Sequence, residues 1–137
     1  MDRTLFMLLS PDKKSLNEII SLGCIKQDID KKIHIYRNDP SGNLLFQALN
    51  EHDGAWYNLN QHAGLYTTQI ELALGKHESF VFPIHTEGNP MGLIYCDRGI
   101  VHKPLTKEDF YSAKNFVNQA QIGLLIYRMQ KSMNQSH

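Results

Sequence analysis

Two apolar runs joined by a short polar turn constrain the fold of this chain more than any other feature of the sequence. The runs are residues 80–84 and 91–96, and both are rich in the aromatic and β-branched residues typical of strands. Between them lies Glu87-Gly88-Asn89-Pro90, where Gly and Asn allow the backbone of a tight turn. The stretch from Glu78 to Arg98 therefore predicts a β-hairpin, and the rest of the chain has to pack around it.

A long helix is predicted directly after this hairpin, from residue 106 to about residue 133. Thr106 and Asp109 have the spacing of a capping box, and Leu105 can pack on Phe110 as a hydrophobic staple. A helical repeat predicts six inward positions, which are Phe110, Ala113, Val117, Ala120, Leu124 and Tyr127. Residues 122–129 are apolar nearly all round, so we expect a second helix, from this chain or from another, to cover them.

The residues upstream predict several short strands. Residues 4–9 are apolar on both alternating sets, which is typical of a central strand covered on both faces. Residues 16–22 predict an antiparallel strand with Leu16, Ile20 and Leu22 on one face, or alternatively a short helix. Residues 32–36 and 55–59 predict two further short strands.

Short helices are predicted between these strands. Residues 44–50 form a helical pattern, for which Asn43 or Ser41 is a plausible N-cap. Residues 60–64 are expected to be a loop. Residues 65–74 are expected to hold one or two helical turns that end at Gly75.

Length and charge narrow the functional class. The 137 residues are enough for one domain, predicted at 1–133 with a frayed tail at 134–137. Lys plus Arg equals Asp plus Glu at 14 each, which argues against a nucleic-acid-binding protein that relies on a general positive field. No run approaches the roughly 20 apolar residues of a membrane helix. Cys24 and Cys96 form no disulfide framework, so a reducing, cytoplasmic location is expected.

The second half of the chain resembles the end of a GAF domain. The matching residues are FVFPI-H-TEGNPMGLIYCDRG and then PLTKEDF followed by NFVNQAQIGLLIYRM. The Tyr95-Cys96-Asp97-Arg98 corner is most similar to GAF-like regions beside HDOD modules of bacterial signalling proteins. In the first half, RTLFMLLSPDKKSL and NLLFQALNEHDGAWYNL are less specifically similar to the first hairpin and the central helix and strand.

The resemblance implies an α+β fold of the GAF, profilin-like or PAS-like kind. The expected architecture is an antiparallel sheet of five or six strands, with a long C-terminal helix on one face and short helices and loops over the other. GAF domains usually have a helix ahead of the first strand, whereas here that strand begins almost at Met1. We therefore expect either a fragment of a longer protein or a truncated version, and self-association through the last helix. The residues expected at that interface are Phe116, Ala120, Gly123, Leu124 and Tyr127.

The resemblance also implies a ligand pocket on the sheet face that the residues from Trp56 to Leu74 cover. Aromatic and polar groups there would suit a small planar ligand. The candidate pocket residues are Trp56, Tyr57, His62, Tyr66 and Arg98. The alternative is that these aromatic residues simply fill the core. No cyclic-nucleotide signature is present.

Catalytic and metal-binding patterns are weak in this sequence. The seven histidines have no i, i+4 spacing and no Cys in ligand register, so neither a metal nor another cofactor is expected. One branch of the GAF family resembles methionine sulfoxide reductases, but neither Cys24 nor Cys96 matches their cysteine arrangement. Cys96 is expected to be a buried core residue. The adjacent Asp97 and Arg98 could place an Arg at a pocket edge to meet an anion, but a structural corner is favoured.

These observations favour a non-enzymatic regulatory module of bacterial signal transduction. We expect a homodimer that binds a small molecule and works with a partner signalling domain such as HDOD. The first alternative is a structural dimerisation module with a closed pocket. The second is a small redox enzyme that uses Cys24 or Cys96.

Overall fold

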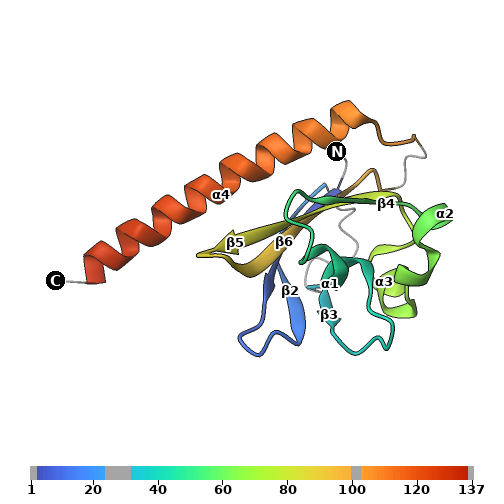
Figure 1. Ribbon diagram of the computed structural model, residues 1–137, viewed down its shortest axis with the longest axis horizontal. Coiled ribbons are helices and arrows are strands. Elements are labelled where there is room, and N and C mark those ends of the chain that lie inside the picture. Colours follow the sequence, from blue (N-terminus) through green and yellow to red (C-terminus); the bar gives the residue numbers. More distant parts are fainter. Residues whose placement is uncertain (1–2, 24–31, 100–102, 136–137) are drawn as a thin grey trace.

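The fold is a six-stranded antiparallel sheet with one long helix on one face and three short helices on the other (Figure 1). In this computed structural model, the described residues are 3–23, 32–99 and 103–135, with side chains described as far as residue 123 and at residue 130. The strand order is β3-β2-β1-β6-β5-β4. The strands are β1 (Arg3–Leu9), β2 (Ser15–Leu22), β3 (His34–Tyr36), β4 (Ala55–Tyr57), β5 (Ser79–Thr86) and β6 (Asn89–Asp97). The helices are α1 (Leu44–Ala48), α2 (Leu59–His62), the 3₁₀ turn η1 (Ala63–Leu65), α3 (Thr68–Leu74) and α4 (Lys107–Gln135). This architecture is the predicted one.

The β5–β6 hairpin is confirmed, with a tighter turn than the sequence predicted. Glu87 and Gly88 alone form the turn, with φ angles of 53° and 82°. Two successive positive φ angles are typical of a type I′ hairpin turn, whose twist matches that of the strands. Asn89, which was expected in the bend, pairs with Thr86 as the first residue of β6.

β1 is a central strand, as predicted, and it lies between β2 and β6. The contact between β1 and β6 is close at Gly92, where a Cβ atom would lie 2.1 Å from the carbonyl oxygen of Met7. Real Cβ atoms do not approach that closely, so the pairing of these two strands requires glycine at this position.

β2 is a strand rather than the alternative helix, but its apolar residues do not share one face. Phe6 pairs with Ile20 and the next residue, Met7, pairs with Glu18, so β2 has one extra residue, Ile19, at this point. Such a bulge reverses the alternation of side chains. Leu16 consequently lies in the core opposite α4, whereas Ile20 and Leu22 lie on the α4 side. The prediction that all three share a face is wrong for this reason.

The face opposite α4 is filled by a large apolar core. The sheet contributes residues such as Leu5, Leu93 and Tyr95, and helices α1 and α3 cover them with Leu45 and Ile70. Asn43 caps α1 as expected, because its side chain accepts hydrogen bonds from the amides of residues 45 and 46. Gly75, with a φ angle of 86°, ends α3.

The predicted loop at residues 60–64 is wrong. This segment is helix α2 followed by the 3₁₀ turn. Asn58 caps α2, and its Oδ1 accepts a hydrogen bond of 2.8 Å from the amide of Gln61. A four-residue helix with no buried residue leaves no apolar period in the sequence, so only its cap could have indicated it.

The capping box and the hydrophobic staple of α4 are confirmed. The Thr106 amide donates to Asp109 Oδ2 at 2.9 Å, and the Asp109 amide donates to Thr106 Oγ1 at 3.1 Å. Leu105 and Phe110 lie in one apolar cluster with Phe80, Phe82 and Val117. No helix in the described residues is both long and apolar enough to cross a membrane.

The inward face of α4 is only partly as predicted. Ala113 and Val117 are buried, whereas Ala120 is exposed. Ala120 borders an open groove instead of a closed core. Further along, the C-terminal end of α4 extends past the β5–β6 hairpin (Figure 1). The side chains of Leu124 and Tyr127 lie outside the described residues.

A buried carboxylate joins the first and the last strands of the sheet. Asp97 has no exposed surface and accepts hydrogen bonds from Arg3 Nε at 3.1 Å, from the Gly99 amide at 2.7 Å and from the Tyr95 hydroxyl. Arg3 also donates to the carbonyl oxygen of Leu74, at the end of α3. The structural interpretation of the Asp97 corner is therefore supported.

Replacement of Asp97 should be strongly destabilising. We expect Asp97→Asn to lower the free energy of unfolding by about 3 kcal/mol, because it leaves the guanidinium of Arg3 without its buried counter-ion. Urea unfolding followed by circular dichroism measures this change. The control is Asp53→Asn, the same substitution at a side chain that is 94% exposed. Equal effects of the two substitutions would contradict the assigned role.

Candidate functional site

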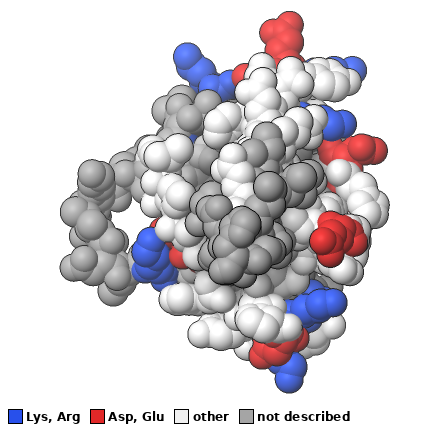
Figure 2. All heavy atoms as spheres, turned by 90° about the vertical axis from the view of Figure 1, so that its left-hand side faces the viewer, with Lys and Arg blue, Asp and Glu red and all other residues white. Residues whose placement is uncertain are grey.

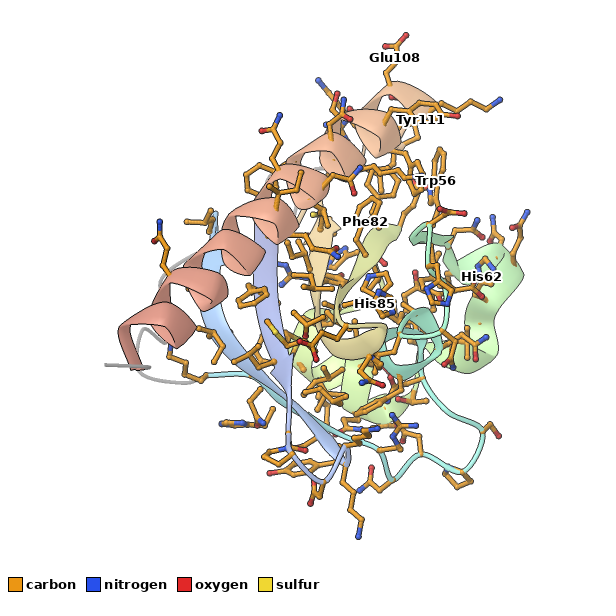
Figure 3. The ribbon with its side chains drawn as sticks, turned by 60° about the vertical axis from the view of Figure 1, so that its left-hand side comes forward. Trp56, His62, Phe82, His85, Glu108 and Tyr111 are labelled. Carbon is orange, nitrogen blue, oxygen red and sulfur yellow. The ribbon has the colours of Figure 1, made fainter. Side chains whose placement is uncertain are left out.

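The five residues predicted to line a ligand pocket lie in three different places. Trp56 lies on the α4 face, where its ring centroid is 5.2 Å from that of Phe80 and 6.2 Å from that of Phe110. Its Nε1 donates to Glu78 Oε2 at 2.9 Å. Figure 3 shows Trp56 near the start of α4 and His62 apart from it, on α2. Trp56 and His62 therefore do not share a cavity.

Tyr57, His62 and Tyr66 lie together on the opposite side of the sheet. Tyr57 and Tyr66 are 4% and 6% exposed, and the rings of Tyr57 and His62 meet edge to face at 5.1 Å. The Tyr66 hydroxyl donates to the carbonyl oxygen of His77 at 2.7 Å. Burial raises the pKa of Tyr66 to about 12, so this phenol is neutral at physiological pH. The buried Tyr57 hydroxyl has no hydrogen-bond partner among the described residues.

Arg98 lies apart from both groups. It directly follows β6, and its side chain reaches the first turn of α4. Its Nη2 is 2.7 Å from Asp109 Oδ2. It lines a cavity of about 410 Å³ together with Lys76, His77 and Lys103. Arg98 is therefore at the edge of a cavity, although not at the cavity that the sequence predicted.

An apolar groove of about 370 Å³ lies between α4 and the sheet. Its exposed walls are Phe116, at 55%, Ile20, at 55%, and Leu22, at 59%. The full lining is Thr4, Phe6, Ile20, Leu22, Ile84, Ile94, Phe116 and Ala120. Sequence analysis found Phe116 and Ala120 but missed the β2 residues, because only the bulge at Ile19 turns them toward α4.

The structure gives no support to nucleophilic chemistry at Cys96. Cys96 is 3% exposed, and its Sγ accepts a hydrogen bond from Thr4 Oγ1 at 3.9 Å. Burial raises its pKa to about 11, so the reactive thiolate is scarce at neutral pH. Cys24 lies outside the described residues. A redox mechanism with Cys96 as attacking group is therefore disfavoured on physical grounds.

No metal site is found in the described part of the chain, where no three His, Cys, Asp or Glu side chains gather closely enough. Two histidine rings, those of His52 and His85, are stacked with their centroids 4.8 Å apart. Desolvation and the proximity of His52 lower the pKa of His85. This pair connects the segment after α1 to β5. Figure 3 labels His85, which lies near the end of β5.

Comparison with solved structures identifies the fold. The second GAF domain of DevS from Mycobacterium smegmatis is similar, with a TM-score of 0.70 and 19% identity, over 96% of this chain and 86% of that one. A methyl-accepting chemotaxis protein, residues 122 to 287, gives a TM-score of 0.73 at 15% identity, over 95% and 81% of the two chains. A GAF domain/HD domain protein from Geobacter sulfurreducens gives 0.67 at 13% identity, over 94% and 82%.

The chain has the fold of GAF domains. The expected fold is thereby confirmed, including the sheet and the C-terminal helix. No family model matches the sequence, and no curated protein matches it either. At identities below 20% the structural similarity concerns the fold, and the ligand and partners of this chain have to be argued from its own residues.

The histidine pair should make stability depend on pH. A His whose pKa is lower in the folded chain than in the unfolded chain destabilises the fold when it takes up a proton. We expect the free energy of unfolding to fall as the pH decreases below about 6.5, the pKa of an unperturbed His. His85→Gln should reduce this decrease, measured by urea unfolding at pH 7.5 and pH 5.5. His34→Gln, at an exposed position, is the control and should leave the decrease unchanged.

Proposed function

We propose that this chain is a non-enzymatic, GAF-like regulatory module that forms homodimers through α4 and the apolar groove beside it. The groove is the observation that carries the proposal. Its walls are Phe116 on α4 and Ile20 and Leu22 on β2, and each of these side chains is more than half exposed. Apolar surface gathered in this way is typical of an interaction site.

The shape of α4 favours a second copy of the same helix as the occupant of the groove. The helix has 29 residues, which correspond to about 43 Å at 1.5 Å per residue. Its C-terminal end passes beyond the sheet, so that end has no sheet to pack against (Figure 1). The sequence of the C-terminal half of α4 contains the apolar run 122–126. In a symmetric pair, α4 of each copy can lie against the groove of the other.

The charge distribution favours the same interface. Figure 2 shows the side of the molecule toward which the C-terminal end of α4 points, and the charged side chains coloured there are of both signs and form no patch of one sign. Among the groove residues none is charged. Burial of this surface therefore requires little desolvation of charge, which is one of the costs of forming an interface.

Dimerisation should depend on Phe116. We expect a mass near 31 kDa, twice 15.7 kDa, in multi-angle light scattering at high micromolar concentration. Phe116→Asp should weaken association at least tenfold, because it places a charge in the apolar contact. The control is Leu72→Asp, which removes a leucine that is 84% exposed on α3, away from the groove. A monomeric wild-type chain, or equal weakening by Leu72→Asp, would contradict the proposal.

The proposed ligand site is the aromatic layer around Tyr57, between β4 and α2. The unpartnered Tyr57 hydroxyl supports this site, because a buried polar group without a partner costs free energy that a bound molecule recovers. Tyr66 and His62 supply a neighbouring hydroxyl and a ring for stacking. A signal from such a ligand would reach a cytoplasmic partner domain, such as HDOD, through α4.

Native mass spectrometry tests this ligand site separately from the dimer. We expect freshly purified chain to retain a small molecule that Tyr57→Phe releases or weakens, while the dimer mass is unchanged. The matched control is Tyr36→Phe, at a tyrosine that is 53% exposed. A clean apo mass for the wild-type chain would instead favour a purely structural dimerisation module with a closed pocket.

A further inference from the structure

The cavity beside Arg98 has a basic lining that the proposed regulatory function does not use. Three cationic side chains line it, Lys76, Arg98 and Lys103, with His77 beside them. Glu78 is the one acidic residue in the lining. Two of the cations also have an acidic partner outside the lining, since Lys76 Nζ is 3.7 Å from Glu71 Oε2 and Arg98 Nη2 is 2.7 Å from Asp109 Oδ2.

The carboxylate of Glu78 forms no ion pair with these cations in the described residues, and both of its oxygens accept hydrogen bonds from other groups. Oε2 accepts from Trp56 Nε1 at 2.9 Å, and Oε1 accepts from the Leu105 amide at 2.8 Å. These bonds hold Glu78 against the Trp56 ring and the segment that precedes α4. Glu78 therefore holds the wall of the cavity in position through these two hydrogen bonds.

Arg98 retains an unused donor. Its Nη2 pairs with Asp109 Oδ2, which also accepts the Thr106 amide and so completes the cap of α4. Its Nε is buried and has no hydrogen-bond partner among the described residues. A buried N–H of a charged group without an acceptor is rare and points to a missing acceptor, such as an anion or water.

We infer that this cavity binds a small molecule through a compact oxyanion, either a phosphate or a carboxylate group. Arg98 supplies a planar set of N–H donors, and Lys76 and Lys103 supply exposed ammonium groups at the rim. The volume of about 410 Å³ is within the range of small-molecule sites. The site is distinct from the aromatic layer around Tyr57, and it does not depend on the proposed dimer.

Titration of the full chain with inorganic phosphate and, separately, with acetate tests the site. Binding is followed by ¹H–¹⁵N NMR shifts of the Lys76 and Gly99 amides, with sodium chloride at the same ionic strength as a reference. We expect saturable shifts with at least one oxyanion and none with chloride. The oxyanion that saturates at the lower concentration identifies the group that the site prefers.

The variant Lys76→Gln/Lys103→Gln should weaken that binding at least tenfold without unfolding the chain, since both lysines are exposed or half exposed. Arg98→Lys keeps the charge but removes the planar donors, and it should also weaken binding. Lys14→Gln, at an exposed lysine in the β1–β2 turn, should have no effect. Non-saturable shifts, equal shifts with chloride, or equal loss in Lys14→Gln would overturn the inference.

Discussion

β6 must be buried on both faces, and most of the structure follows from that constraint. Leu93 and Tyr95 point into the core under α1 and α3, while Ile94 and Cys96 point into the core under α4. A strand covered on both sides needs partners along both edges, which β1 and β5 provide. At the end of β6, Asp97 pairs with Arg3, the first residue of β1. The same strand therefore also fixes the position at which β1 begins.

The two faces of the sheet are covered to different degrees. Helices α1 and α3 and the aromatic residues of the α2 region close one face with a continuous core. On the other face, α4 covers β5 and β6 through Ala113 and Val117 but leaves the strip formed by β1 and β2 open. One helix cannot cover six strands, because helices pack 8–10 Å apart while strands lie about 4.8 Å apart. The uncovered strip is the groove, and its apolar lining is the physical basis for proposing that a second chain covers it.

Local sequence signals predicted most of the fold, and they failed where the decisive information was not local. The capping box of Thr106 and Asp109 and the cap at Asn43 were predictable, because each depends on residues no more than three positions apart. The bulge at Ile19 was not, since it depends on how β2 pairs with a different strand. Alternation alone therefore predicted Ile20 on the wrong face, so the residues that β2 contributes to the groove were not predicted.

The candidate sites were harder to predict for the same reason. Trp56 and Tyr57 are neighbours in the sequence, yet successive residues of a strand point to opposite faces, so they belong to different cores. Arg98 was predicted at a pocket edge, but its companions Lys76 and Lys103 come from segments that no local pattern connects with it. Composition could not indicate this cluster either, because the chain as a whole has 14 Lys and Arg residues and 14 Asp and Glu residues.

The basic cavity and the apolar groove are connected by a single element, and this bears on how a regulatory module of this kind could work. Arg98 pairs with Asp109 in the first turn of α4, and Phe116 lines the groove seven residues further on, about 10 Å along the helix. A helix transmits displacement at its end along its length, because its hydrogen bonds keep it rigid. Between these two points Ala113 holds α4 against the sheet. If an oxyanion binds in the inferred cavity, the Arg98–Asp109 pair therefore joins that cavity to the helix through which we propose that two chains meet.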